Sequence, residues 1–174
     1  MKKIGTLLLL SFLITGCTQV QPDSKAPKKE ATTTSSSQIN VPSFFHLSVL
    51  KDVNWEEAPS FIEGKIPLKG IERRIAMADT PIVANEQNEI MWYFLDSQMP
   101  TGKLSIIALK QGSVTPTQVL FQQETSKQTW TTSNIIYSTT IELPLTMSLP
   151  SSGLWVLNIY VNEKYYDQFV ITAK

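Results

Sequence analysis

From Val41 onward the chain consists of short runs of β-branched and aromatic residues separated by Pro, Gly, Asn and Ser. Such runs favour strands, and the residues between them favour turns. No stretch of helical period is long enough to connect parallel strands, so the strands should pair antiparallel. The sequence therefore predicts an all-β fold, an antiparallel sandwich of about seven to eight strands over residues 41–174.

Eight segments carry the strand pattern. The six clearest are residues 89–95, 103–110, 118–122, 134–143, 154–161 and 165–172. Two more, 45–50 and 71–77, are weaker predictions. The tract 144–153, with Pro150 and Gly153, is expected to be a long connection between the two sheets.

The terminal hairpin gives the clearest register. Its first strand places one set of side chains on a single face: Trp155, Leu157, Ile159 and Val161. The opposite face contains Asn158 and Tyr160, which predicts that this face is turned to solvent. In the turn, Asn162 suits a positive φ, but Glu163 carries a steric cost there. Either the turn type differs or the turn stores strain.

A different composition precedes this region. Lys2-Lys3 is followed by an almost wholly apolar run over residues 4–14, and the run closes with Leu13-Ile14-Thr15-Gly16-Cys17. At about 1.5 Å per residue such a run spans only about half of a roughly 30 Å hydrocarbon core. We interpret residues 1–16 as a lipoprotein signal peptide and the Cys17 thiol as the acceptor of diacylglycerol. A transmembrane helix and a plain secretory signal are the alternatives.

Residues 17–40 comprise the lipidated Cys17 and a Ser/Thr/Lys-rich linker with few large apolar residues. Such a segment cannot bury enough surface to offset its ordering entropy, so it predicts a flexible tether. The expected partner is the lipid bilayer, reached through acylated Cys17. The expected location is the extracytoplasmic face of the cell membrane.

The runs around Met91-Trp92-Tyr93-Phe94, Gly102-Lys103-Leu104 and Met147 to Trp155 resemble those of a family of Bacillus-type lipoproteins. The most specific part is Ser-Leu-Pro-Ser-Ser-Gly-Leu-Trp, which ends at Trp155. The resemblance covers residues 59–174 and the motif around Cys17. It implies an immunoglobulin-like β-sandwich on an extracytoplasmic lipoprotein. It implies no activity, because the domain of that family is uncharacterised.

The residues that most catalytic sites require are scarce. His46 is the only histidine, and Cys17 is the only cysteine and is expected to carry lipid. Zinc or copper sites need several such ligands, and a serine triad would have to use His46. We therefore expect no catalytic residue, metal or cofactor. Residues 41–174 hold ten basic and thirteen acidic side chains, a net charge of −3, and this balance argues against nucleic acid as a partner.

Four tryptophans are candidates for core or contact positions. Trp92 and Trp155 lie inside apolar strands and are expected in the core. Trp130 lies in a polar stretch, where a large ring is either a lid on the core or an exposed contact. Trp130 and Trp55 are the candidate ligand or partner contacts. The segment 55–61 (WEEAPSF) around Trp55 is a second candidate patch.

The leading hypothesis is a noncatalytic binding module, held on the membrane, that recognises a protein, peptide or cell-wall component through loops or a sheet edge. One alternative is a cell-envelope hydrolase that uses carboxylates or a Ser-Lys pair, for which a cleft with shifted pKa values would be diagnostic. A second alternative is an extracellular protease inhibitor with a protruding loop.

Overall fold

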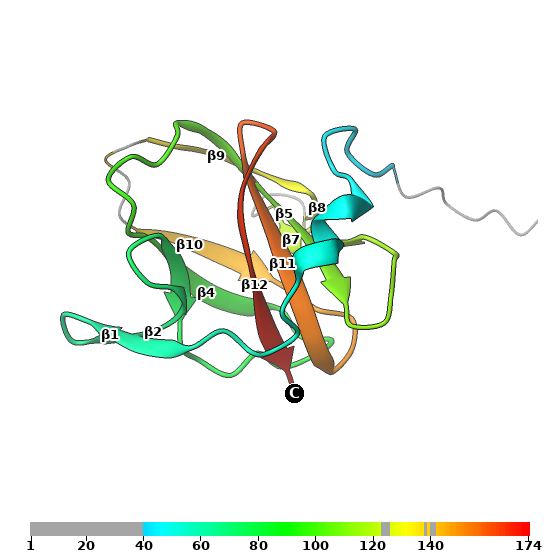
Figure 1. Cartoon of the computed structure of the whole chain (residues 1–174), viewed down its shortest axis with the longest axis horizontal. Helices are drawn as coiled ribbons and strands as arrows, with labels where there is room; N and C mark the ends of the chain where they lie inside the picture. Colours follow the sequence, from blue (N-terminus) through cyan, green and yellow to red (C-terminus); the bar gives the residue numbers. More distant parts are fainter. Residues whose placement is uncertain (1–39, 123–125, 138, 140–141) are drawn as a thin grey trace, which may run out of the picture. The chain divides into compact units, whose positions relative to one another are not determined.

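Two antiparallel sheets face each other in the computed structural model (Figure 1). The structure describes residues 40–122, 126–137, 139 and 142–174. Within these residues the predicted antiparallel sandwich is confirmed. The predicted signal peptide, Cys17 and the predicted linker up to residue 39 lie outside the described residues.

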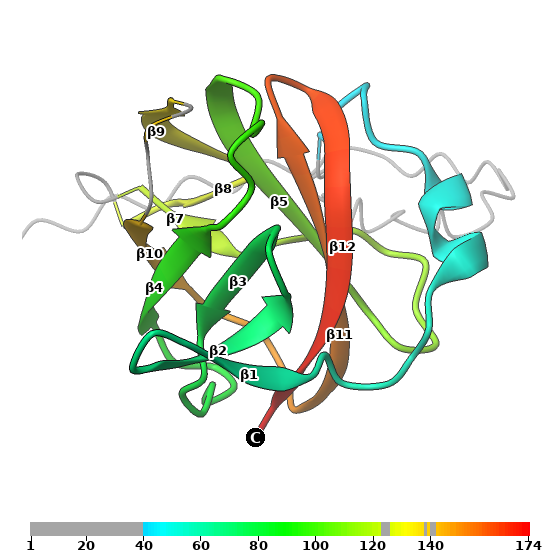
Figure 2. The same cartoon turned by 60° about the vertical axis from the view of Figure 1, so that its left-hand side comes forward.

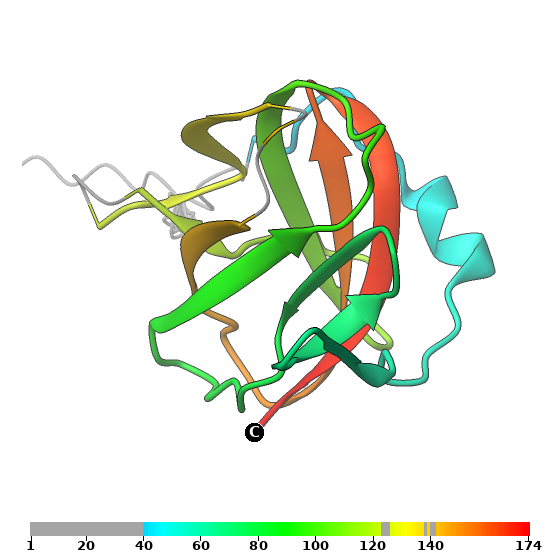
Figure 3. The same cartoon turned by 90° about the vertical axis from the view of Figure 1, so that its left-hand side faces the viewer.

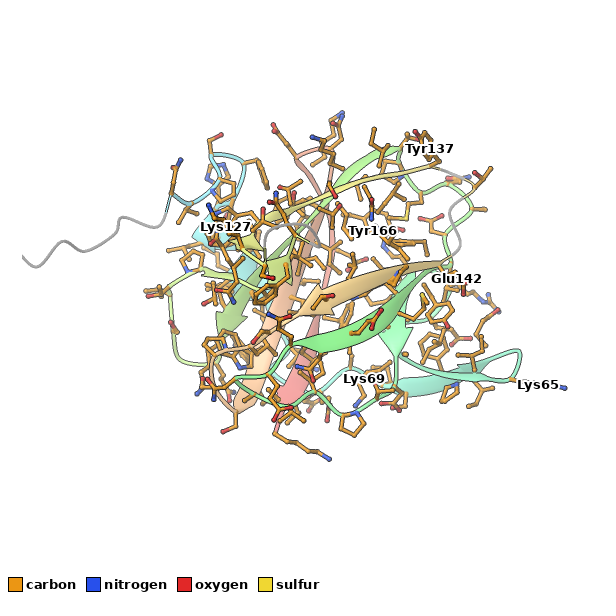
Figure 4. The ribbon with its side chains drawn as sticks, turned by 180° about the vertical axis from the view of Figure 1, so that it is seen from behind. Lys65, Lys69, Lys127, Tyr137, Glu142 and Tyr166 are labelled. Atoms are coloured by element: carbon orange, nitrogen blue, oxygen red, sulfur yellow. The ribbon has the colours of Figure 1, made fainter. Side chains whose placement is uncertain are left out.

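The larger sheet has seven strands in the order β1-β2-β3-β4-β10-β7-β8. Their bounds are β1 (Ser60–Glu63), β2 (Ile66–Ile71), β3 (Ile75–Ala78), β4 (Asn88–Phe94), β10 (Glu142–Met147), β7 (Leu120–Phe121) and β8 (Gln128–Thr129). Figure 4 shows Lys65 at the tip of the β1–β2 hairpin, directed away from the sheet. β1 is thus a short edge strand whose turn projects into solvent.

The smaller sheet has the order β12-β11-β5-β6, and β9 also pairs with β5. Its strands are β5 (Gly102–Lys110), β6 (Thr117–Gln118), β9 (Thr131–Ile136), β11 (Gly153–Val161) and β12 (Lys164–Ala173). The described residues thus form twelve strands, more than the seven to eight expected. The excess comes from the unexpected β1, β2 and β8, and from the predicted segments 118–122 and 134–143, each of which is divided between two strands.

Five of the expected segments need correction. Residues 118–122 are not one strand, because β6 pairs with β5 in the smaller sheet and β7 pairs with β10 in the larger one. Residues 134–143 are not one strand, because β9 pairs with β5 and β10 pairs with β4 in the other sheet. Residues 71–77 are not one strand, because they contain the turn between Ile71, where β2 ends, and Ile75, where β3 begins. The tract 144–153 is only partly a connection, since β10 extends to Met147. Residues 45–50 fall mostly in the 3-10 helix η1 (Leu47–Asp52), where Val49 N–H donates to the His46 carbonyl oxygen.

The inner core lies between the sheets and is built from side chains of both. Trp92 from β4 and Phe169 from β12 meet with ring centroids 5.7 Å apart. The expected inward set of β11, with Trp155, Leu157, Ile159 and Val161, belongs to this core. Trp92 and Trp155 are therefore core residues, as predicted.

The outer face of the smaller sheet is also buried, which contradicts the prediction that Asn158 and Tyr160 face solvent. Residues 41–59, here called the strap, run over this face and include η1 (Figures 2 and 3). Phe44 and Phe45 of the strap pack on Tyr160, with centroids 5.1 and 6.5 Å from its ring. Burying these rings removes a large apolar area from water and so stabilises the strap on the sheet.

Residues 45–50 belong to the strap, which lies on the face of the smaller sheet and not beside one of its edge strands. They therefore do not extend the sheet. The outer cluster consists of one strap residue, of Trp130 between β8 and β9, and of outward side chains of β5, β11 and β12: Phe45, Trp130, Ile107, Leu109, Val156, Tyr160 and Val170. Apart from Asn158, the side chains of β11 are therefore apolar or aromatic on both faces, as in a sheet that is covered on both sides.

The β11–β12 turn stores strain. Asn162 has φ 50° and Glu163 has φ 64°, so both residues occupy the left-handed region. Of the two outcomes that the sequence left open, the structure therefore shows the strained turn. Among the described residues, no helix is long and apolar enough to cross a membrane.

Candidate functional site

The strap crosses from one sheet to the other and closes a cavity beneath it. Ala58 N–H donates to the Val170 carbonyl oxygen at 2.8 Å, which ties the strap to the edge of β12. Gly70 N–H of β2 donates to the Pro59 carbonyl oxygen at 3.2 Å. A cavity of about 310 Å³ lies at this crossing. We call it the strap cavity.

Three parts of the chain form the wall of the strap cavity. The strap contributes Asp52, Val53, Asn54, Glu56, Glu57, Ala58 and Pro59. β2 contributes Gly70 and Ile71, and the smaller sheet contributes Val156, Gln168, Phe169 and Val170. Gly70 has φ 148°, and a Cβ there would come within 2.6 Å of the Ile75 carbonyl oxygen, so only glycine fits this part of the wall.

One wall residue, Gln168, has a side-chain atom without a partner. The side-chain Oε1 of Gln168 is buried and accepts no hydrogen bond from the described residues. A buried acceptor without a donor costs free energy, typically about 1–3 kcal/mol. Because this oxygen is inaccessible to solvent, its missing donor is a cost of the folded interior and not a group offered to the cavity.

Lys69 links Glu57, a strap residue of the cavity wall, to the larger sheet. Its Nζ lies 2.7 Å from Glu57 Oε1 and 3.2 Å from Asp79 Oδ1. The hydrogen bond from Lys69 holds the pKa of Glu57 below its usual value, and a hydrogen bond from Ser60 does the same for the pKa of Asp79. Burial alone would lower the pKa of Lys69, but its bonds to the two carboxylates raise it. These three groups are ionised and paired at neutral pH.

A second ionic cluster lies where the β2–β3 loop meets β12. Arg74 Nε donates to Asp167, and Arg74 Nη1 is 3.6 Å from Asp96 Oδ2. The Tyr166 hydroxyl donates to Asp96 Oδ2 at 3.0 Å, and the Arg74 guanidinium lies 4.3 Å from the Tyr166 ring centroid. A backbone hydrogen bond from Gln98 is the main cause that lowers the pKa of Asp96. A general acid would need a raised pKa, so this carboxylate is suited to ion pairing.

The two predicted contact residues, Trp130 and Trp55, lie on the outer face of the smaller sheet. Trp130 is only 8% exposed, and its Nε1 donates to the Asn40 carbonyl oxygen at 2.9 Å. The sequence analysis allowed two positions for Trp130, a lid on the core or an exposed contact. The buried ring occupies the first of these. Trp55 is half-buried and packs against the outer cluster. A role of either ring in binding stays a prediction.

A second cavity, about 440 Å³, lies where the strap begins. It is lined by Asn40, Val41, Pro42, Ser43, Phe44, Thr129, Trp130, Thr131 and Glu163. Trp130 thus belongs to a cavity wall, although its ring is buried. Its wall includes Asn40, the first residue that the structure describes.

The candidate patch 55–61 contributes to the strap cavity through Glu56, Glu57, Ala58 and Pro59, whereas Trp55 itself is not part of the wall. The other wall residues were missed. Gly70, Gln168 and Phe169 are far apart in the sequence and share no motif. Only the strap side of the wall could be anticipated from the sequence, because there the polar pair Glu56-Glu57 stands beside Trp55 in the candidate patch.

The side chains relevant to catalysis are placed as follows. His46 is exposed and precedes η1 without a side-chain capping bond. Lys110 Nζ donates to Ser151 Oγ at 2.9 Å, so one Ser-Lys pair is in contact. In the part of the chain that the structure describes, no group of three or more His, Cys, Asp or Glu side chains is arranged to hold a metal ion.

The fold and the cavity define a class of domain: an antiparallel β-sandwich whose smaller sheet is covered on its outer face by an N-terminal strap. The chain belongs to the family described as Domain of unknown function (DUF4871), which matches residues 44–171. The predicted membership of an uncharacterised lipoprotein family is thereby confirmed.

A solved crystal structure supports the same assignment. It is that of a protein from Bacillus anthracis, provisionally described as a lipoprotein. The two sequences are 84% identical, the match covers 80% of this chain and 100% of the other, and the TM-score is 0.77. This likeness supports the interpretation of the chain as a lipoprotein. A comparison with curated proteins finds no match.

Proposed function

We propose that this chain is a noncatalytic binding module, anchored to the extracytoplasmic face of the membrane through lipid on Cys17, and that it holds a ligand group in the strap cavity. The observation that carries the proposal is the strap cavity, whose wall combines carboxylates of the strap with apolar side chains of β2, β11 and β12. Concave sites with a few polar groups among apolar ones are typical of ligand binding. The ligand would be part of a protein, a peptide or a cell-wall component.

The two sheets support this proposal because they hold the wall rigidly. Val156, Phe169 and Val170 of the wall belong to β11 and β12, which are paired along most of their length. The strap side is held by the Ala58 bond to β12 and by the Lys69 bridge to Glu57. A preformed wall lowers the ordering cost of binding.

Site-specific photo-crosslinking in intact cells tests the binding function. A photoreactive residue replaces Asn54, which is exposed and lines the cavity, in the full chain. The matched control replaces Glu89, an exposed residue of β4 outside the cavity wall. We expect a discrete adduct from position 54 that is absent from position 89. No adduct from position 54, or the same adducts from both positions, would contradict the proposal.

A second candidate function, a Ser-Lys hydrolase, is favoured by the contact between Lys110 and Ser151. The catalytic form of such a pair needs a neutral lysine that takes the serine proton. In the structure the contact joins the end of β5 to the loop before β11, and neither residue lines the strap cavity. Binding therefore remains the leading proposal.

A fluorophosphonate probe distinguishes the two functions. A hydrolase should label at Ser151, and Ser151→Ala should abolish labelling while Ser152→Ala leaves it intact. The binding proposal predicts no labelling of either serine. Labelling that depends on Ser151 would establish the enzyme and displace the binding module as the leading function.

A further inference from the structure

We infer that the strap is a releasable cover: residues 41–56 detach from the outer face of the smaller sheet while the sandwich stays folded. This inference goes beyond the proposed binding function and involves no ligand. Three features carry it: how the strap is fastened, how little of it is buried, and which atoms it covers.

The strap is fastened at its two ends. At its start the Trp130 indole Nε1 donates to the Asn40 carbonyl oxygen at 2.9 Å. At its end Glu57 pairs with Lys69, and the Ala58 N–H donates to a carbonyl oxygen of β12. Between these ends the backbone hydrogen bonds among described residues stay within the strap: Phe45 to Pro42, Val49 to His46 and Val53 to Leu50. The middle of the strap can therefore leave the sheet without breaking any strand pairing.

The strap buries little apolar surface of its own. Phe45, which is 7% exposed, is the one buried residue among residues 41–59. The other apolar strap side chains of the outer cluster are only partly buried: Val41, Phe44, Val49, Leu50, Val53 and Trp55. η1 contains no buried residue and has no side-chain cap. Segments with few buried apolar contacts open at a lower free energy than the core.

The strap covers a group of buried polar atoms without partners. Asn158 and Gln168 lie opposite each other on β11 and β12, and Tyr160 follows two residues after Asn158 on the same face. Asn158 Oδ1, Gln168 Oε1 and the Tyr160 hydroxyl have no hydrogen-bond partner among the described residues. The remaining atom of this kind there, Trp92 Nε1, belongs to a residue of the inner core. The cost of unmet hydrogen bonds is thus concentrated on the face that the strap covers.

Opening the strap and unfolding the sandwich have different costs. Opening exposes the partly buried apolar side chains of the strap, but it also returns water to two amide oxygens and one hydroxyl. Unfolding exposes in addition the inner core between the sheets. The strap should therefore open much more often than the sandwich unfolds, as a local opening.

Release of the strap changes the cavity and the length of the tether. Asp52 to Glu56 leave the cavity wall, whereas its sheet side and the fastened segment from Glu57 to Pro59 stay in place. The strap also follows directly on the predicted tether, so release adds residues 41–56 to the chain between Cys17 and the sandwich. At about 3.3–3.6 Å per extended residue, these residues add at most about 50–60 Å of reach.

Cysteine labelling on the two faces of one strand tests the inference in the full chain extracted in detergent. Val156 and Val161 are both buried in β11, but Val156 belongs to the outer cluster and Val161 to the inner core. Val156→Cys and Val161→Cys are each treated with iodoacetamide, and labelling at that position is read by peptide mass spectrometry. We expect position 156 to be labelled about a hundredfold or more faster than position 161. Its rate should depend only weakly on urea below the unfolding transition, because local opening exposes little surface.

Second substitutions in the Val156→Cys chain show whether the covered polar atoms promote opening. Tyr160→Phe and Gln168→Met each remove an unpaired polar atom and keep most of the side-chain volume. Each should therefore slow labelling at position 156 by about tenfold. Leu50→Ala, which shortens a strap side chain packed on the outer cluster, should accelerate labelling. Circular dichroism melts confirm that the variants remain folded.

Two results would overturn the inference. Equal labelling rates at positions 156 and 161, with the same urea dependence, would show that the strap opens only when the sandwich unfolds. Unchanged or faster labelling after Tyr160→Phe and Gln168→Met would show that these polar atoms have partners in the closed form. If Val156→Cys prevents folding, Val170→Cys replaces it, because Val170 is 2% exposed and belongs to the same outer cluster.

Discussion

Removing the Tyr160 hydroxyl should stabilise the protein. Tyr160 is 2% exposed, its ring packs between β11 and the strap, and its hydroxyl is buried without a hydrogen-bond partner among the described residues. Tyr160→Phe keeps the ring contacts and deletes only the unsatisfied group. Because a buried unpaired hydroxyl typically costs about 1–3 kcal/mol, the free energy of unfolding should rise by about 1 kcal/mol or more.

The same hydroxyl makes stability depend on alkaline pH. Burial raises the pKa of Tyr160 from its ordinary value of 10.0 to about 12. The folded pKa lies above the unfolded one, so the unfolded chain loses the phenol proton first. The free energy of unfolding is therefore unaffected by this ionisation below pH 10 and falls as pH rises from 10 toward 12. A difference of two pKa units corresponds to about 2.7 kcal/mol at most. Tyr160→Phe should therefore flatten the decline of stability above pH 10.

Urea unfolding of the wild-type chain and the variant at pH 7 and at pH 11 measures both effects. Tyr166→Phe is the matched control, because the Tyr166 hydroxyl donates to Asp96 at 3.0 Å. That substitution should lower the free energy of unfolding, because it removes a hydrogen bond to a charged group. If Tyr160→Phe lowers stability at pH 7 as Tyr166→Phe does, then the Tyr160 hydroxyl has a partner and the reasoning is refuted.

Three further substitutions test the core, the turn and the strap. Trp155→Ala should cost about 3–5 kcal/mol in denaturant melts, because the ring is 3% exposed in the inner core, and a loss under about 1 kcal/mol would show that the ring is not core. Glu163→Gly should raise stability by about 0.5–1 kcal/mol by relieving the left-handed φ of 64°; lower stability in the same melts would contradict the strained turn. Trp130→Phe should speed amide hydrogen exchange in the first residues of the strap, because it deletes the hydrogen bond from the indole Nε1 to the Asn40 carbonyl oxygen. Unchanged exchange would show that this hydrogen bond does not hold the strap.

Much of the fold could be predicted from local patterns. The strands over residues 89–95, 103–110, 154–161 and 165–172 agree with β4, β5, β11 and β12 to within one or two residues. They are long and rich in β-branched and aromatic residues, so local preference and burial point to the same structure. Residues 134–143 were predicted wrongly as one strand because both halves carry the strand pattern. Only the pairing partners, β5 and β4, separate them into two sheets.

The candidate site was largely beyond prediction. The segment 55–61 was identified as a patch, and it does supply part of the strap cavity. Gln168 and Phe169, however, look in the sequence like ordinary members of a terminal strand. Their significance arises because the strap crosses the β12 edge at Val170 and leaves Gln168 beside the cavity.

The sequence by itself determined the strand-rich character, the inward face of β11 and the membership of a lipoprotein family, because each depends on residues that are adjacent or alternate along the chain. Only the tertiary structure decided what covers the outer face of the smaller sheet. Alternation shows that Tyr160 and Val156 lie opposite Trp155 and Leu157, but it cannot show that a segment about a hundred residues earlier packs on them. That contact depends on apolar burial between distant segments, and it leaves no local periodicity in the sequence.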